Sequence, residues 1–286
     1  MNMKIIRSLQ EMKTVTRALK NEGRSLGLVP TMGYLHEGHL SLVRACLKAA
    51  DICVVSVFVN PTQFGPHEDF KEYPRDLLRD TGLLEQEGVT FIFAPQPEDM
   101  YPSNYKTYVE VHDLQNKLCG KSRPTHFRGV CTVVLKLFNI VNPDIAFFGQ
   151  KDAQQAIILN RMTEDLNLDV SIKILPIIRD KDGLALSSRN AYLDPRQRQA
   201  ALVLYRGLKQ AEELFEQGVR ESELLLGKIK DEIKTEPMVK LDYVEIVDLR
   251  NLEPLSLIEK EALIAAAVFI GRVRLIDNII VNIEEE

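Results

Sequence analysis

The stretch from Leu26 to Val59 constrains the fold more than any other part of the chain. An apolar run beginning at Leu26 stops at Pro30, a helical repeat of apolar residues follows as far as Ala50, and a continuous apolar run covers Ile52–Val59. Continuous apolar runs are typical of strands that are covered on both faces, as in a parallel sheet. Strand, helix and strand in this order predict a right-handed βαβ unit.

The alternation continues as far as Ile178. We expect helices at Ile5–Lys20, Leu77–Glu87, Val130–Val141 and Ala153–Asp165, and further strands at Val89–Ala94, Tyr105–Val111, Ile145–Phe148 and Ser171–Ile178. Strands that alternate with helices in this way build an α/β fold. The prediction is a doubly wound, Rossmann-like parallel sheet of about five strands.

The pattern changes after Ile178. A helix that starts at Asp194-Pro195 and a second at Glu221–Lys234 are followed by three strand-like runs without helices between them, at Leu241–Val247, Ala262–Ile270 and Val273–Ile283. Strands joined without helices normally pair antiparallel. We therefore expect a Rossmann-like domain over residues 1–178 and a smaller α+β domain with an antiparallel sheet over residues 179–286.

Composition limits the partners of the chain. The formal net charge of −5 over 286 residues argues against a broad nucleic-acid surface, which requires a basic face. The longest apolar run, Ala262–Gly271, is too short to span a membrane, and the first residues turn polar too soon for a signal peptide. The cysteines have neither metal-site nor disulfide spacing, which predicts reduced thiols and a cytoplasmic protein; they are Cys46, Cys53, Cys119 and Cys131.

The segment Pro30–His39, PTMGYLHEGH, is the first candidate site. It predicts a tight loop from the end of a strand to a helix that starts near His36. Backbone N–H groups and the positive end of the helix dipole converge at such a place and bind anions. His36 and His39 are three residues apart, so both can face this pocket.

The residues alone leave other interpretations of this segment open. Gly33 and Gly38 have the spacing of a P-loop, but His39 stands where that motif requires lysine. His36 and His39 are one residue too close for the zinc-protease motif, and no cysteine pair lies nearby. Two histidines at a helix start can also simply satisfy local hydrogen bonds. A dinucleotide-binding glycine fingerprint is absent from the sequence.

Further polar segments follow predicted strands or lie in predicted loops. Asn60–Asp76 is a long stretch without periodicity after a strand, which is typical of a functional loop or lid. Lys121–Gly129 is a basic loop that could hold an anion. Gln150-Lys151-Asp152 opens a helix after the strand that ends near Gly149, and Leu186–Asn190 is a polar loop. Histidines, a lysine, an arginine and paired hydroxyls without a P-loop suit an enzyme that attacks the α-phosphorus of ATP, because they stabilise the charge that develops on the departing pyrophosphate.

Five of these segments together resemble the pantothenate synthetase family of pantoate–β-alanine ligases, and the resemblance runs nearly end to end. They are PTMGYLHEGH at Pro30–His39, FVNPTQFGP at Phe58–Pro66, HFRGV at His126–Val130, GQKDAQQ at Gly149–Gln155 and LSSRN at Leu186–Asn190. The family has a nucleotidylyltransferase-like fold with an HxGH signature. The resemblance implies an ATP-dependent condensation of pantoate with β-alanine through an enzyme-bound pantoyl adenylate, with release of pyrophosphate and AMP.

The resemblance also implies the site residues. ATP is expected to contact Met32, Gly33, Tyr34, Leu35, His36, Glu37, Gly38, His39, Gly149, Gln150, Lys151, Asp152, Ile178, Leu186, Ser187, Ser188 and Arg189. The catalytic groups among these are expected to be His39, as the acid, with His36, Lys151, Ser187, Ser188 and Arg189. Pantoate and β-alanine are expected to lie against Pro30, Thr31, Asn60, Gln63, Tyr73 and Gln155.

The same resemblance implies a homodimer and small-molecule substrates, and the ATP chemistry implies Mg²⁺ with unassigned ligands. Neither nucleic acid nor a membrane is expected as a partner. Gln150, Ala153 and Leu186 replace the glutamate, aromatic residue and methionine that are most usual in the family. Ala153 and Leu186 can change the packing of the pocket. The alternatives are a related nucleotidyltransferase that releases an adenylylated product, an aminoacyl-tRNA synthetase, and a nucleotide-sensing protein without catalysis.

Overall fold

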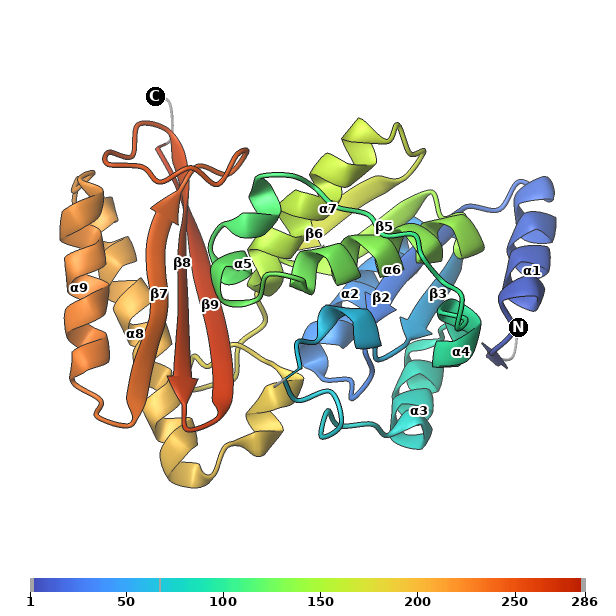
Figure 1. Ribbon diagram of the computed structural model, residues 1–286, viewed down its shortest axis with the longest axis horizontal. Coiled ribbons are helices and arrows are strands. Elements are labelled where there is room, and N and C mark those ends of the chain that lie inside the picture. Colours follow the sequence, from blue (N-terminus) through green and yellow to red (C-terminus); the bar gives the residue numbers. More distant parts are fainter. Residues whose placement is uncertain (1–2, 67, 284–286) are drawn as a thin grey trace. The chain divides into compact units, whose positions relative to one another are not determined.

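The structure of the protein is a computed structural model that describes residues 3–66 and 68–283 (Figure 1). The chain forms two compact units. The N-terminal unit comprises Met1–Gln115, Arg123–Gly149 and Ile158–Pro176, and the C-terminal unit comprises Asn116–Ser122, Gln150–Ile157 and Ile177–Glu286. The contiguous domains 1–178 and 179–286 stay a prediction, since two short segments before Ile178 group with the C-terminal unit.

Within the described residues, the N-terminal unit holds a six-stranded parallel sheet with the order β1-β4-β3-β2-β5-β6. The strands are β1 (Lys4–Ile6), β2 (Leu26–Thr31), β3 (Ile52–Val57), β4 (Phe91–Phe93), β5 (Ile145–Gly149) and β6 (Ser171–Leu175). The predicted doubly wound sheet is confirmed. Its order reverses between β2 and β5, and open α/β sheets bind ligands beyond the carboxyl ends of strands at such a point. β2 ends at Thr31, directly before the HxGH segment, and β5 ends at Gly149.

Pro30 lies inside β2, although the sequence predicted that the strand would stop there. β2 pairs with β5 only at Gly27 and Leu28, whereas its pairing with β3 continues to Thr31. Pro30 therefore has a strand neighbour on one side only, opposite Ser56. A proline is tolerated at such a position because no inner ladder needs its missing N–H.

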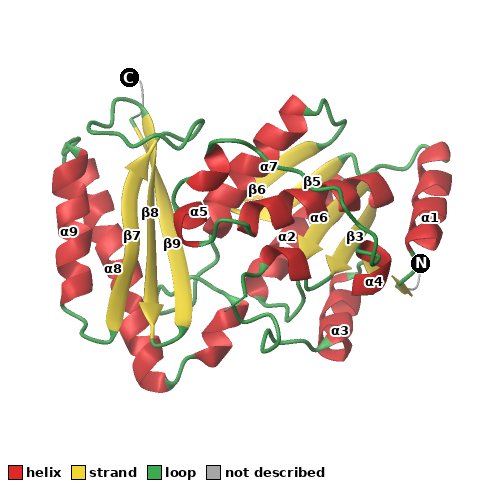
Figure 2. Ribbon diagram, in the orientation of Figure 1, coloured by secondary structure: helices red, strands yellow, loops and turns green. Residues whose placement is uncertain are grey.

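Helices cover the parallel sheet, as the secondary-structure colours of Figure 2 show. On one face, α2 and α3 bury Leu40, Val43 and Leu84 against Val55 and Ile92 of the sheet. The helices that precede β6 in the chain are labelled in Figure 1. They are α1 (Leu9–Asn21), α2 (Glu37–Ala49), α3 (Leu77–Glu87), α4 (Pro97–Met100), α5 (Cys119–Ser122), α6 (His126–Val141) and α7 (Ala153–Asp165). Short 3-10 helices are η1 (Pro61–Gln63), η2 (Leu114–Asn116), η3 (Gln150–Asp152) and η4 (Ser188–Tyr192).

The first predicted helix begins too early. Residues Lys4–Ile6 form β1, which pairs in parallel with β4, and α1 starts only at Leu9. Ser8 is the N-cap of α1, and its side chain accepts the N–H of Glu11. An N-cap marks the start of a helix, so the apolar residues before Ser8 lie outside α1. They pair with β4 instead.

Two predictions between residues 105 and 129 are wrong. Tyr105–Val111 forms no strand; the Val109 N–H instead donates to Thr132 Oγ1 of α6 at 3.0 Å, and the rings of Tyr105 and Tyr108 meet edge to face at 5.6 Å. Side-chain packing against α6 and between aromatic rings replaces the strand pairing that β-propensity had indicated. The predicted basic loop Lys121–Gly129 is largely helical, since α5 ends at Ser122 and α6 begins at His126.

The C-terminal unit packs two helices on a three-stranded antiparallel sheet of order β7-β8-β9, as predicted. Leu208 and Ile229 of the helices lie in one core with Ile246, Ile264 and Val268 of the strands. Asp194 caps the first helix by accepting the N–H groups of residues 196 and 197. The elements are α8 (Pro195–Glu216), α9 (Ser222–Lys234), β7 (Val239–Val247), β8 (Glu261–Ile270) and β9 (Val273–Asn282).

Searching residues 3–66 and 68–283 finds no helix that is both long and apolar enough to cross a membrane. Cys46, Cys53, Cys119 and Cys131 are free and buried. Burial raises the pKa of the Cys131 thiol to about 12, which keeps it protonated and unreactive at neutral pH.

Candidate active site

A buried carboxylate of α3 holds the loop between β2 and α2. Asp80 is 1% exposed and accepts the N–H groups of Tyr34 at 2.7 Å and Leu35 at 2.8 Å. Burial raises the pKa of Asp80, while the two backbone donors favour its charged form. The loop is left-handed at Gly33, with φ of 83°, and at Tyr34, with φ of 50°. A Cβ on Gly33 would also stand 3.1 Å from an Asp80 oxygen, so the position requires glycine.

The two histidines lie side by side at the start of α2. His36 is the N-cap, and the ring centroids of His36 and His39 are 4.0 Å apart. His39 Nδ1 accepts the N–H of His36 at 3.3 Å. A ring nitrogen that accepts a hydrogen bond carries no proton, so neutral His39 has its proton on Nε2 and can donate it to a ligand oxygen. The spacing predicted an anion site at this helix N-terminus, and the helix dipole and the first N–H groups of α2 favour one there.

Two of the predicted contact residues here use their side chains elsewhere. Glu37 pairs with Arg44, which also binds Glu87 of α3 and so ties the two helices together. The Thr31 hydroxyl donates to the Ser56 carbonyl at 2.7 Å and accepts the Gly33 N–H at 3.1 Å. These two residues can therefore meet a ligand through their backbone rather than through their side chains.

Gln63 stands at the end of η1 with its amide held in one orientation. Asn60 Nδ2 donates to Gln63 Oε1 and to the Gly129 carbonyl, both at 3.1 Å. Gln63 Nε2 then faces Met32 Sδ at 3.1 Å, which joins Gln63 to the HxGH loop. Asn60 is 1% exposed and Gln63 is 8% exposed, so this polar group is built into the interior of the N-terminal unit.

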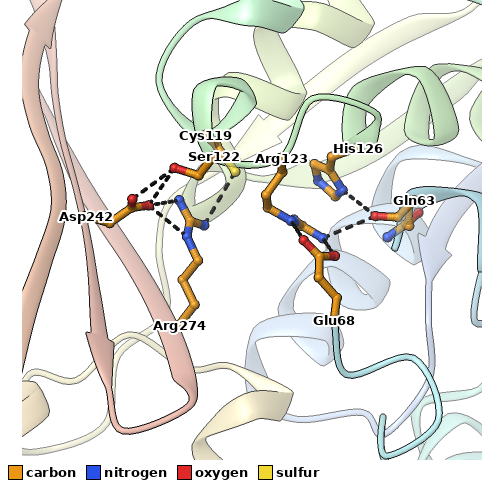
Figure 3. Close-up of polar contacts among 8 residues, drawn as sticks. All are labelled: Gln63, Glu68, Cys119, Ser122, Arg123, His126, Asp242 and Arg274. Atoms are coloured by element: carbon orange, nitrogen blue, oxygen red, sulfur yellow. Dashed lines mark hydrogen bonds and ion pairs between the residues drawn. The ribbon is translucent and has the colours of Figure 1, made fainter. Parts of the chain in front are cut away.

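The backbone of Gln63 is fixed by two side chains from the start of α6 and the segment before it (Figure 3). His126 Nδ1 lies 2.9 Å from the Gln63 carbonyl oxygen, and Arg123 Nη2 donates to the same oxygen at 3.2 Å. Arg123 also forms two 2.6 Å bonds with the Glu68 carboxylate. Partial burial pushes the pKa of Glu68 up, but the hydrogen bonds and the charge of Arg123 outweigh it and the pKa is lowered.

Gly129 explains why the HFRGV segment has a glycine. A Cβ at this position would lie 2.3 Å from the Thr62 carbonyl oxygen, so only glycine lets α6 approach η1 this closely. Tyr73, the other predicted wall of the substrate pocket, is 6% exposed and its ring meets that of Phe64 at 5.9 Å. Phe64 also contacts Phe70, so three aromatic rings of this segment pack together.

A cavity of about 210 Å³ borders the HxGH loop in the N-terminal unit. Met32 and Gly33 line it together with Phe58, Phe70 and Asp80, and its surface is mostly apolar. Among the described residues, its lining does not include His36, His39 or Gln63. The cavity therefore meets the loop at Met32 and Gly33. The polar side chains suited to binding or catalysis, His36, His39 and Gln63, lie outside its lining.

In the C-terminal unit, Asn278 of β9 holds the segment Gln150–Asp152. Asn278 Nδ2 donates to the carbonyls of Gln150 and Lys151, both at 3.0 Å, and its Oδ1 accepts from Gln150 Nε2 at 3.2 Å. Lys151 Nζ lies 3.4 Å from Asp152 Oδ2. The neighbouring glutamines differ: Gln154 is 6% exposed and bonds to the backbone of residues 117 and 119, whereas Gln155 is only half-buried.

The predicted segment Leu186–Arg189 follows a tight reversal of the chain. Leu186 N–H donates to the Ile178 carbonyl at 3.0 Å, and Arg179 and Ala185 form an antiparallel bridge. Ser187 caps η4 and accepts the Arg189 N–H at 3.3 Å. Two hydroxyls, an arginine and the first N–H groups of η4 thus stand on one short turn.

Two basic side chains of the segment around α5 have acidic partners. Lys121 pairs with Glu245 at 2.7 Å in the C-terminal unit, and Arg123 pairs with Glu68 in the N-terminal unit. Figure 3 also shows Ser122 Oγ donating to Asp242, which Arg274 binds at 2.8 Å. These contacts give Lys121 and Arg123 structural partners, and the anion site expected in this segment stays a prediction.

In the part of the chain that the structure describes, no three or more His, Cys, Asp or Glu side chains converge as a metal-binding group would. The described residues therefore do not fit a dedicated protein cage for a metal ion. Mg²⁺ is usually held by one or two carboxylates together with substrate phosphates, which requires no such cage.

The family model described as pantoate-beta-alanine ligase matches residues 4–280. The chain belongs to the pantoate–β-alanine ligase family. It is 56% identical over 280 residues to a pantothenate synthetase of Pelotomaculum thermopropionicum, with 98% of this chain and 99% of that protein covered. It is 57% identical over 281 residues to a pantothenate synthetase of Heliobacterium modesticaldum, with 98% and 100% covered.

Solved structures of this ligase family have the same fold. A pantothenate synthetase from Thermus thermophilus superposes with a TM-score of 0.92 at 43% identity, covering 96% of this chain and 98% of that one. A pantoate-beta-alanine ligase from Francisella tularensis, solved in complex with beta-gamma ATP and beta-alanine, superposes with a TM-score of 0.79 at 33% identity and 97% coverage of both chains.

The sequence analysis missed several buried polar groups that hold the predicted site segments. Asp80 interrupts the apolar stripe of α3 between Leu77 and Leu84, and Asp277 and Asn278 lie between apolar residues of β9. A polar residue on an apolar face is the signal that could have found them. Within each unit the structure brings predicted site residues together, at the HxGH loop with Gln63 and around Gln150–Asp152.

Proposed function

We propose that the chain condenses pantoate with β-alanine at the expense of ATP, forming pantothenate, AMP and pyrophosphate through an enzyme-bound pantoyl adenylate. The observation that carries this proposal is the match of the pantoate–β-alanine ligase family to residues 4–280. The local geometry supports it, since the HxGH loop offers an anion site at the N-terminus of α2.

In the first step, a pantoate carboxylate oxygen attacks the α-phosphorus of ATP, and the bond to the bridging oxygen of pyrophosphate breaks. Negative charge develops on the phosphates, so the chain must supply donors and cations there. His39 donates from Nε2, because its Nδ1 is occupied by the His36 N–H. His36 stands beside it, with the ring centroids 4.0 Å apart, and N–H groups of the first α2 turn add to the site.

The proposal also assigns nucleotide contacts to several residues of the C-terminal unit. Lys151 provides a point charge, and Ser187, Ser188 and Arg189 bind phosphate oxygens through hydroxyls, guanidinium and the N–H groups of η4. Asp152 has an exposed carboxylate that suits the ribose hydroxyls. Ile178 and Leu186, which are hydrogen-bonded through their backbones, lie beside the adenine.

Pantoate is polar and uncharged apart from its carboxylate, and glutamine amides suit its hydroxyls because each offers a donor and an acceptor. Gln63 is one such group, oriented by Asn60. Gln155 is the other, since it is half-buried and its neighbour Gln154 is already used by the backbone of residues 117 and 119. Pro30, Thr31 and Tyr73 complete the wall of the pocket.

In the second step, the amine of β-alanine attacks the carbonyl carbon of the adenylate, loses a proton and expels AMP. This chemistry requires no nucleophile from the protein. The mixed anhydride must be protected from water, and the loops 60–76 and 186–190 are the segments placed to do so. Gln63 also lies beside the position of the amine in this proposal.

Pyrophosphate–ATP exchange tests the proposal. We expect exchange that depends on pantoate and proceeds without β-alanine, since adenylation is reversible. Addition of β-alanine should then release AMP and form pantothenate. An adenylylated product instead of free AMP would identify a nucleotidyltransferase, and ATP binding without exchange or ligation would identify a nucleotide sensor.

Three further properties belong to this proposal. Mg²⁺ enters with the phosphates of ATP, so chelation should abolish exchange and added Mg²⁺ should restore it. The chain acts as a homodimer, which light scattering would report as twice the 32.5 kDa of one chain. Its place is the cytoplasm, which fractionation of cells that express it can test.

A further inference from the structure

Asp277 and Asn278 are consecutive polar residues in the middle of strand β9, between apolar pairs Leu275-Ile276 and Ile279-Ile280. Each is only 3% exposed. A buried polar side chain destabilises the fold unless its donors and acceptors find partners. Asn278 binds the Gln150–Lys151 segment, which the proposed function assigns to ATP, and Asp277 binds Arg179, which follows the assigned Ile178.

Asn278 binds the segment that carries Lys151. Its Nδ2 donates to the Gln150 and Lys151 carbonyls at 3.0 Å each, and its Oδ1 accepts from Gln150 Nε2 at 3.2 Å. Two carbonyl partners require the NH₂ group on that side, so the amide has one orientation. These bonds fix the backbone on both sides of the Lys151 Cα, from which the ammonium group extends.

Asp277 binds the residue at the base of the other phosphate segment. Arg179 donates to its two carboxylate oxygens at 2.6 Å and 2.9 Å. Arg179 also donates to the Gly183 carbonyl at 3.2 Å and bridges to Ala185, directly before Leu186–Arg189. The Asn278 N–H donates to Asp277 Oδ1 at 2.8 Å, which links the two side chains into one network.

We propose that Asp277 and Asn278 are positioning residues of the ATP site, through which β9 holds the Lys151 segment and the base of the Ser187–Arg189 segment as one assembly. The inference rests on the proposed function. Cations stabilise a developing charge only when they are held in place before the reaction, because reorientation during the step cancels the gain. β9 supplies this rigidity, since it is paired along its length with β8.

A different result is expected if the Asp277–Asn278 network has a purely structural role. If the network only stabilises the C-terminal unit, its loss lowers the melting temperature and leaves the kinetics of the folded protein unchanged. If it positions Lys151, its loss raises the KM for ATP and slows exchange, while the KM for pantoate changes little.

The test compares Asn278→Ser and Asn278→Ala with Asn282→Ser and Asn282→Ala, which alter an exposed asparagine of the same strand. Serine keeps one hydroxyl donor, so the Asn278→Ser variant carries the test if the alanine variant fails to fold. Pantoate-dependent pyrophosphate–ATP exchange is measured well below the melting temperature of each variant. For Asn278→Ser we expect the KM for ATP to rise about tenfold, the effect of one or two lost hydrogen bonds, with the KM for pantoate within about twofold.

A double-mutant cycle with Lys151→Ala shows whether Asn278 affects the KM for ATP through Lys151. If Asn278 acts through Lys151, Asn278→Ser changes the KM for ATP by less than about twofold in the Lys151→Ala background. Additive effects, or Asn278→Ser kinetics equal to those of Asn282→Ser, would overturn the inference. Absence of pantoate-dependent exchange in the unaltered chain would instead overturn the proposed function, so the two failures are distinguishable.

Discussion

At the scale of single residues, hydrogen bonding decides what the two histidines can do. The His36 N–H occupies Nδ1 of His39, which leaves Nε2 as the proton-bearing atom. The ring centroids lie 4.0 Å apart, so two full positive charges on them would repel each other. The pair therefore presents His39 Nε2 as an N–H donor to an incoming phosphate, with the His36 ring beside it.

We expect His39→Ala to lower kcat about a hundredfold or more, the effect of removing one donor to a transition-state oxyanion. Steady-state ligation assays measure it, with His112→Ala as the control because His112 is exposed. The control should stay within about twofold of the unaltered chain. A His39→Ala turnover within a few-fold of the unaltered chain would remove His39 from the chemistry.

Gln63 is the second residue to which the proposed function assigns a role, in this case the binding of pantoate. Gln63→Ala should weaken pantoate binding about tenfold or more, because an oriented amide is lost, and leave ATP affinity within about twofold. Titration calorimetry measures both ligands, and the exposed Gln10→Ala is the matched control. Equal losses for both ligands would contradict the assignment of Gln63 to pantoate.

At the scale of elements, the loop 60–76 is held at Glu68 and Gln63 by the segment before α6 and by the first residue of that helix. Arg123 is bound to Glu68 by two 2.6 Å bonds and to the Gln63 carbonyl, and His126 contacts the same carbonyl. Gly129 permits the close approach of α6 to η1. Glu68 and the Gln63 amide, which the proposed function assigns to pantoate, are thus parts of one packed assembly.

The lowered pKa of Glu68 predicts how this assembly responds to acid. A carboxylate with a pKa below its ordinary value of 4.5 stabilises the folded protein above that value. The stabilisation disappears as the pH falls from about 4.5 through the lowered pKa. Glu68→Gln should therefore cost about 1–3 kcal/mol of unfolding free energy at pH 7, since it leaves the guanidinium of Arg123 without its charge partner.

Urea unfolding of the unaltered chain and of Glu68→Gln between pH 7 and pH 3 measures this difference, with the exposed Glu98→Gln as the control. The difference should shrink toward zero at the acid end. A difference that stays constant over the whole range would show that the Arg123–Glu68 pair does not titrate as described.

At the scale of the whole molecule, each unit has its own hydrophobic core. Val43, Leu84 and Ile92 belong to the core of the N-terminal unit, and Leu208 and Ile264 belong to that of the C-terminal unit. A cavity made in one core acts first on the elements that line it. The two units should therefore respond separately to core substitutions.

Leu208 is fully buried, so Leu208→Ala should destabilise the C-terminal unit by about 2–5 kcal/mol. Hydrogen exchange should accelerate in α8, α9 and β7–β9 more than in the parallel sheet. Leu224→Ala alters a leucine that is 58% exposed and should change stability by less than about 0.5 kcal/mol. Equal acceleration in both sheets would show that the chain unfolds as a single cooperative unit.

The βαβ alternation, the antiparallel sheet and the position of the HxGH segment could be predicted from the sequence. These follow from local periodicity and from the chemistry of neighbouring residues, which any stretch of chain carries with it. Prediction failed at Lys4–Ile6, at Tyr105–Val111 and at the start of α6, where the state of a segment depends on what packs against it.

The pairing of buried polar groups, in contrast, depends on contacts between residues far apart in the chain. Asp80 reaches Tyr34 across 46 positions of sequence, and Asn278 reaches Gln150 across 128. Burial makes these pairings specific, because a carboxylate or amide removed from water must find its partners inside the protein. The sequence contains both partners of each pair, but only the fold brings them within hydrogen-bonding distance of each other.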